Sequence, residues 1–108
     1  MKSMSYAAVA LAGALTLSGP VQAESAPGLM LAEQQNCMSC HSVNRPFMGP
    51  PLHDIAAKYA SRTDAATYLA HKIIDGSIGV WGQVPMPANT QLTPDQAATL
   101  AGWILSLK

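Results

Sequence analysis

The chain has 108 residues and no formal net charge at neutral pH, with six Lys or Arg against six Asp or Glu. This balance argues against the basic surface that nucleic-acid binding requires, and the length allows only one small domain. The two cysteines, Cys37 and Cys40, could form only a disulfide with a tiny loop, which would add little stability.

The first 23 residues have the layout of a secretory signal peptide. Lys2 supplies a positive start, residues 7–17 form an almost wholly apolar run, and Val21-Gln22-Ala23 is the expected cleavage sequence. The run is too short to cross a bilayer core of about 30 Å as a helix, which disfavours an uncleaved membrane anchor. We therefore expect residues 1–23 to be removed on export and residues 24–108 to form the folded domain.

Helical patterns account for most of this domain. Pro27 suits an early position of the first helix. In the third, Thr63 is a suitable N-cap and Gly76 a suitable C′ glycine in the left-handed conformation. The four expected helices cover about residues 27–40, 52–59, 63–75 and a final segment from residue 93 onward.

The last helix has the clearest start signal. Thr93-Pro94-Asp95-Gln96 matches a capping box, with Thr at the N-cap, Pro at N1 and Gln at N3. Apolar residues then recur at helical spacing, at Ala97, Leu100, Ile104 and Leu107. Since no segment shows strand-like alternation, the expected fold class is all-α. Residues 42–51 and 77–92 are long loops, which small domains seldom contain unless they are functional.

The stretch "CMSCH" carries the most specific chemical signal. Its C-x-x-C-H pattern, formed by Cys37, Cys40 and His41, is an attachment site for c-type haem. On a helix these three positions share one face, so two sulfurs can bond the haem vinyl groups while the imidazole lies under the iron.

Three other interpretations of the motif compete with haem attachment. A thioredoxin-like redox pair would need a βαβ pattern, and a structural zinc site would need a fourth ligand. A chance motif in an unrelated domain is opposed by the signal peptide, because haem is attached after export.

A second axial ligand would come from a methionine or another histidine. Met86 is favoured because it lies far along the chain from His41, and Pro85 and Pro87 hold its segment extended. The alternative is that Met86 is a buried core residue. The other candidates are Met30, Met38, Met48, His53 and His71.

The chain resembles the class I cytochromes c, in particular the short, single-haem bacterial kind known as the c-eight type. The resemblance spans residues 27–108 and depends on "CMSCH", "MGPPLHDIAAKYA", "IIDGSIGVWGQVPMPAN" and "LAGWILSLK". It implies a small all-α fold of about four helices wrapped around one covalently bound haem c, in which the N- and C-terminal helices cross.

The resemblance also implies roles for individual residues. The Pro50 carbonyl should accept a hydrogen bond from His41 Nδ1–H, the Trp81 indole should donate to a haem propionate, and Asn89 should hydrogen-bond the Met86 sulfur. Lys72 stands where an arginine often pairs with a propionate, and a lysine cannot bind bidentately.

The expected function is periplasmic electron transfer with His41 and Met86 on the iron, and no enzymatic activity. Such a carrier would be a monomer that binds no nucleic acid and does not insert stably into a membrane. Its redox partners would be of the kinds that the resemblance suggests: a cytochrome bc-type complex, a nitrite reductase, a terminal oxidase or a cytochrome c peroxidase. A haem enzyme or gas sensor with a labile sixth ligand, and a disulfide oxidoreductase, are the alternative functions.

Overall fold

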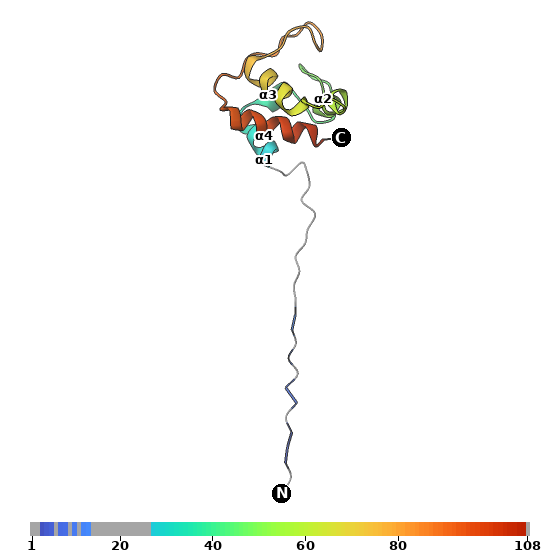
Figure 1. The fold of residues 1–108 in the computed structure, drawn as a ribbon, viewed down its shortest axis with the longest axis vertical. Helices are drawn as coiled ribbons and strands as arrows, with labels where there is room; N and C mark the ends of the chain where they lie inside the picture. The colour runs from blue at the N-terminus through green and yellow to red at the C-terminus, as the bar shows by residue number, and fades with distance from the viewer. Residues whose placement is uncertain (1–2, 6, 9, 11, 14–26, 108) are drawn as a thin grey trace.

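The computed structural model describes residues 3–5, 7–8, 10, 12–13 and 27–107 of the chain, and its folded part is helical (Figure 1). The expected cleavage sequence at residues 21–23 lies outside the described residues. Within them the helices are α1 (Pro27–Gln34), the short 3-10 helix η2 (Cys37–Ser39), α2 (Leu52–Tyr59), α3 (Ala65–Asp75) and α4 (Pro94–Leu105). Apart from one isolated antiparallel bridge between Ser77 and Met86, the described chain contains no β-structure, so the predicted all-α class is confirmed.

The first helix is shorter than predicted. It ends at Gln34, whereas the apolar pattern predicted a helix to Cys40. Asn36 adopts the left-handed conformation, with φ 62° and ψ 19°, and the chain then continues as η2. Asparagine is one of the few residues other than glycine that tolerate this conformation. The C-x-x-C-H motif therefore lies on a tight 3-10 turn after α1, and the prediction of one continuous helix is wrong.

The third helix also starts later than predicted. Asp64, not Thr63, occupies the N-cap position, and its side chain makes no capping hydrogen bond. The carboxylate is instead paired with the guanidinium of Arg62. At the other end, Gly76 has the expected positive φ of 79°, but its ψ of −178° is extended and not left-handed helical.

The capping box of α4 is confirmed. Gln96 N–H donates to Thr93 Oγ1 at 3.2 Å, and Thr93 N–H donates to Gln96 Oε1 at 3.0 Å. Two backbone donors at the helix start are thus satisfied reciprocally. This fixes where α4 begins.

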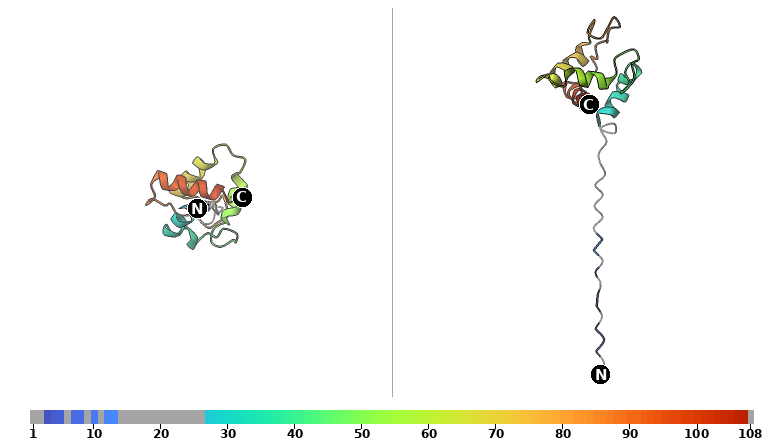
Figure 2. Two further views of the ribbon diagram at one scale, coloured as in Figure 1. Left: turned by 90° about the horizontal axis from the view of Figure 1, so that it is seen from below. Right: turned by 90° about the vertical axis from the view of Figure 1, so that its right-hand side faces the viewer.

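The two terminal helices pack closely, as expected. Figures 1 and 2 show α1 lying against α4. Gly28 is buried at this contact, and a Cβ atom there would overlap Cβ and Cγ of Trp103. The crossing therefore requires a residue without a side chain.

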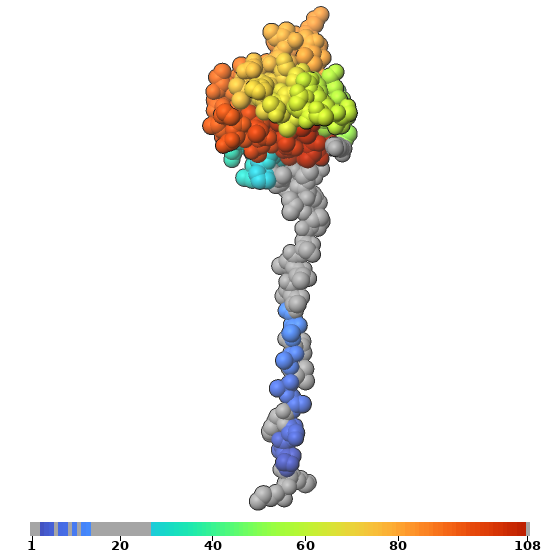
Figure 3. Space-filling model, viewed as in Figure 1, coloured from blue at the N-terminus to red at the C-terminus, as the bar shows by residue number. Residues whose placement is uncertain are grey.

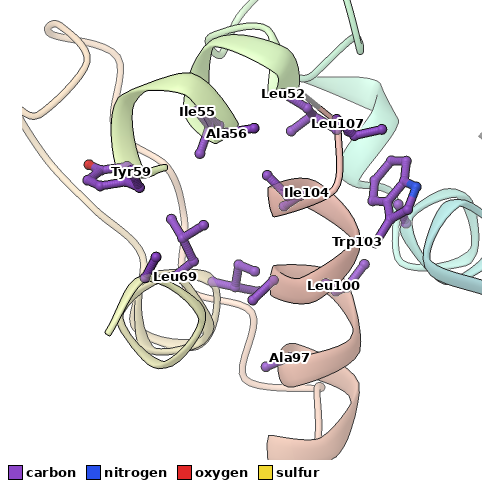
Figure 4. Close-up of a cluster of buried hydrophobic side chains, with 14 of the residues drawn as sticks. Leu52, Ile55, Ala56, Tyr59, Leu69, Ala97, Leu100, Trp103, Ile104 and Leu107 are labelled. Atoms are coloured by element: carbon purple, nitrogen blue, oxygen red, sulfur yellow. The ribbon is translucent and has the colours of Figure 1, made fainter. Parts of the chain in front are cut away.

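The buried face of α4 forms the centre of the core. Leu100 is its largest fully buried side chain, and α2 and α3 cover the same face (Figure 4). The space-filling view shows that part of the 77–92 loop protrudes from the helical body (Figure 3). None of the helices in the described part of the chain is long and apolar enough for a membrane span.

Candidate functional site

An open cavity of about 220 Å³ lies among α2, α3, α4 and the two long loops. Apolar walls with few polar groups are typical of small-molecule and cofactor sites. The cavity brings together all but one of the predicted site residues, namely Cys37, Cys40, His41, Pro50, Lys72, Trp81 and Met86. Asn89 is not part of its wall.

His41 is oriented by a backbone carbonyl. Its Nδ1 lies 2.8 Å from the oxygen of Pro50. Because a carbonyl can only accept, Nδ1 must carry the hydrogen and donate it, which leaves the lone pair of Nε2 available to a metal. The structure thus contains the hydrogen bond that the family resemblance implied.

Gly49 lies directly against the same imidazole. Its N–H donates to the Cys40 carbonyl at 2.8 Å, and a Cβ atom at this position would lie 2.6 Å from His41 Cε1. Any side chain would therefore displace the histidine ring or the loop. Sequence reasoning did not single out Gly49, although a glycine before Pro50-Pro51 in a functional loop is a recognisable signal of close approach.

The two cysteines are unpaired and half-buried. Burial raises the pKa of the Cys37 thiol, and a negative charge on Cys40 would raise it further, while a backbone hydrogen bond opposes the rise. A thiol with a raised pKa is protonated at neutral pH and is a poor nucleophile. This disfavours the alternative of a disulfide oxidoreductase.

Only two of the candidates for a second axial ligand border the cavity, and both are methionines. Met48 and Met86 line it, whereas Met30 is 59% exposed on α1 and takes no part in its wall. The others, Met38, His53 and His71, also lie outside the wall. Met48 is 56% exposed and belongs to the loop that holds Gly49 and Pro50 beside His41.

Met86 is half-buried, and its backbone is paired with Ser77, two residues after the end of α3. Ser77 N–H donates to the Met86 carbonyl at 3.0 Å, and Met86 N–H donates to the Ser77 carbonyl at 2.8 Å. Pro85 and Pro87 flank it, as the sequence requires. Its main chain is therefore held both by its neighbours and by a distant element.

The expected hydrogen bond from Asn89 to the Met86 sulfur is not the one that the structure contains. Asn89 Nδ2 donates to the Ile73 carbonyl at 2.9 Å and to the Pro87 carbonyl at 3.4 Å, and the Asn89 N–H donates to the Ile74 carbonyl at 3.0 Å. Carbonyls in the last turn of a helix lack intrahelical partners and are stronger acceptors than a thioether. Asn89 thus caps the end of α3.

Tyr59 of α2 and Tyr68 of α3, which sequence reasoning did not single out, form an aromatic wall of the cavity beside Trp81 and Lys72. The rings of Tyr59 and Tyr68 lie 5.2 Å apart, and both border the cavity. The ammonium of Lys72 lies 5.5 Å from the Tyr68 ring, and that of Lys58 lies 5.2 Å from the Trp81 ring. Of the two predicted propionate-binding residues, Trp81 therefore has the positive charge of Lys58 beside it, and Lys72 carries its own positive charge beside Tyr68.

Comparisons of the sequence with known proteins all indicate the same protein family. A sequence model described as cytochrome c matches residues 25–108. The chain is 53% identical over 97 residues to cytochrome c-552 of Nitrosomonas europaea, covering 90% of each chain. It is 44% identical over 108 residues to cytochrome c-551 of Stutzerimonas stutzeri, covering 100% of each.

A solved structure is similar over the same region. The crystal structure of wild-type Nitrosomonas europaea cytochrome c552 matches with a TM-score of 0.73 and 56% identity, over 74% of this chain and 99% of that one. The similarity in sequence therefore extends to the arrangement of the helices around the cavity.

Proposed function

The chain belongs to the cytochrome c family, and from this premise we propose that it is a periplasmic carrier of single electrons with His41 and Met86 as axial ligands. Family membership implies a covalently bound haem c and a small electron carrier. The cavity supports the proposal of these two axial ligands, because the C-x-x-C-H motif and Met86 both border it although they come from separate segments of the chain.

The donor groups of the cavity fit haem c. Cys37 and Cys40 provide two thiols for thioether bonds to the vinyl groups, and His41 presents Nε2 because Pro50 holds the hydrogen on Nδ1. When bound, haem c supplies an iron that alternates between Fe(III) and Fe(II). The apolar walls around it exclude water, which is one of the means by which a protein sets a haem potential.

Met86 is the better of the two methionines for the sixth position. Met48 is on the loop that already supports His41, whereas Met86 arrives from the other loop and is anchored to the end of α3. A thioether opposite histidine raises the reduction potential. Coordination by both His41 and Met86 would leave the haem iron no open position for oxygen or peroxide chemistry. We therefore assign no catalytic residue.

Trp81 and Lys72 are proposed to hold the haem propionates. Both border the cavity beside the aromatic wall. The indole N–H is a donor, and the ammonium acts as a point charge without the bidentate geometry of an arginine. A hydrogen bond of about 1 kcal/mol to one redox state corresponds to tens of millivolts, since about 59 mV equals 1.4 kcal/mol for one electron.

We place the protein in the periplasm because of the signal-peptide pattern and the need for covalent haem attachment after export. The partners are redox proteins, of the kinds that the resemblance suggests. Exposed apolar side chains near the cavity suit a small, transient interface, and they include Phe47, Met48, Ile78 and Val84. The sequence suggests Met38, Val43, Pro87 and Ala88 for the apolar rim of an exposed haem edge. Of these, Pro87 and Ala88 are exposed, whereas Met38 and Val43 are half-buried against the core.

Optical spectra of the purified holoprotein test this proposal. The wild-type ferric form should show the weak far-red band of iron–methionine coordination, and the ferrous form should not bind CO at neutral pH. Met86→Ala should abolish the band and allow CO to bind, because it removes the proposed sixth ligand. Met30→Ala is the matched control, since Met30 is exposed outside the cavity, and it should retain the wild-type spectrum.

The same spectra identify the alternatives. Loss of the band in Met48→Ala but not in Met86→Ala would transfer the axial role to Met48. A wild-type protein without the band that binds CO readily would be a haem enzyme or gas sensor with a labile sixth site. Titratable thiols without haem would indicate a disulfide oxidoreductase.

A further inference from the structure

The end of α3 holds the Met86 segment through several backbone contacts. The backbones of Ser77 and Met86 each donate a hydrogen bond to the carbonyl of the other. Asn89 donates to the carbonyls of Ile73 and Ile74. We call these contacts between residues 73–77 and residues 86–89 the α3 clamp. It joins the last turn of a helix in the core to the proposed axial ligand.

The loop that leads to Met86 has no comparable backbone support. All residues from 78 to 85 are exposed, and none of their backbone groups takes part in a backbone hydrogen bond. Gly82 in this loop has φ 119° and open space where a Cβ would be. The main-chain position of Met86 is therefore set by the α3 clamp and not by the loop.

Gly76 lies at the closest point of the clamp. Its φ is 79°, and a Cβ atom on it would lie 2.5 Å from the Met86 oxygen and 2.9 Å from the Ala88 nitrogen. Both atoms belong to the backbone, so they cannot rotate away as the end of a side chain could. We propose that Gly76 is a positioning residue for Met86: its missing side chain lets the ligand segment approach α3 closely enough to bring the thioether to the iron. This inference rests on the proposed axial role of Met86.

Gly76→Ala tests the proposal, with Gly82→Ala as the matched control. Both substitutions place a side chain at a positive φ, but only the first meets the Met86 segment, and Gly82 does not border the cavity. In holoprotein, Gly76→Ala should weaken the far-red band and raise the affinity of the ferric form for added imidazole by about tenfold or more, because the thioether is held less well. Gly82→Ala should match the wild type in both measurements.

Equal behaviour of the two variants, whether both unchanged or both impaired, would overturn the proposal. If Gly76→Ala fails to yield holoprotein, hydrogen exchange of the backbone amides in wild-type holoprotein tests the proposal instead. Protected amides at Ser77 and Met86 beside fast exchange over residues 78–84 would support the clamp, and similar rates would overturn it. Failure of the proposed function is distinguishable, because it would appear as a missing far-red band in the wild type itself.

Discussion

Gly49 shows how closely the backbone approaches the proposed proximal ligand. The imidazole of His41 has the Pro50 carbonyl as hydrogen-bond acceptor, and it lies so close to Gly49 that a Cβ atom there would meet its Cε1. Two adjacent residues of one loop therefore determine both the tautomer and the orientation of the ring. Because backbone groups hold the ring in this way, their role cannot be seen in a list of functional side chains.

We expect Gly49→Ala to move the His41 ring or the loop and to lengthen the hydrogen bond to Pro50. Forcing a methyl group into a packed contact typically costs about 1–3 kcal/mol. The midpoint of guanidinium unfolding of the holoprotein should fall accordingly, and the reduction potential should change by tens of millivolts. Asn44→Ala, at an exposed position of the same loop, is the control. Identical midpoints and potentials for the two variants would show that the Gly49 contact has no role.

At the scale of elements, the crossing of α1 and α4 places the haem motif. Gly28 allows the two helices to approach at Trp103, and α1 ends only two residues before η2 carries Cys37. A change in the crossing would therefore move the motif relative to the cavity.

Gly28→Ala should destabilise the protein although alanine is the better helix former. The expected loss is about 1–3 kcal/mol, because the new methyl group overlaps Trp103. Gly102→Ala is a suitable control, since a Cβ at this exposed position of α4 meets nothing. It should raise stability by up to about 1 kcal/mol. Thermal or guanidinium unfolding measures both, and a stabilised Gly28→Ala would contradict the close crossing.

The stability that Tyr59 of α2 contributes should depend on pH. Burial raises the pKa of its hydroxyl, hydrogen bonding with Tyr68 of α3 raises it further, and a hydrogen bond with Trp81 opposes the rise. A raised pKa in the folded state means that the folded protein retains a proton that the unfolded chain loses. Stability that depends on this group is complete below the unfolded pKa of about 10 and is lost as pH rises through the higher folded value.

Tyr59→Phe should therefore reduce the alkaline loss of stability. Unfolding midpoints of wild type and variant should be compared at neutral pH and at several values above about pH 10. Subtracting the two curves removes the contribution of the lysines, which titrate in the same range in both proteins. Parallel curves would mean that Tyr59 does not titrate differently in the folded and unfolded states.

At the scale of the whole molecule, charge is balanced. Six basic and six acidic residues leave no strong overall field to steer a charged partner. The exposed side chains near the cavity include several that are apolar, such as Phe47 and Ile78. Association should thus depend more on apolar contact than on long-range attraction.

Electron-transfer rates with a physiological partner should accordingly depend only weakly on ionic strength. Between low salt and about 0.2 M, where charges are screened beyond about 8 Å, we expect a change of less than about tenfold. Stopped-flow measurement across this range is the direct check. A steep fall, as in strongly steered pairs, would show that local charges such as Lys58 and Lys72 control docking.

The sequence by itself determined what depends on local chemistry. The capping box at Thr93, the helix over residues 52–59 and the C-x-x-C-H motif all follow from neighbouring residues, and the structure contains each of them. The all-α class also follows, because helical periodicity and the absence of alternation are properties of short windows.

Only the tertiary structure decided what depends on contacts between distant segments. Asn89 donates to the Ile73 carbonyl at the end of α3 instead of to a sulfur. The approaches of Gly28 to Trp103 and of Gly76 to Met86 join residues far apart in the chain. A sequence shows that a glycine is present, but only the folded backbone shows what a side chain there would meet.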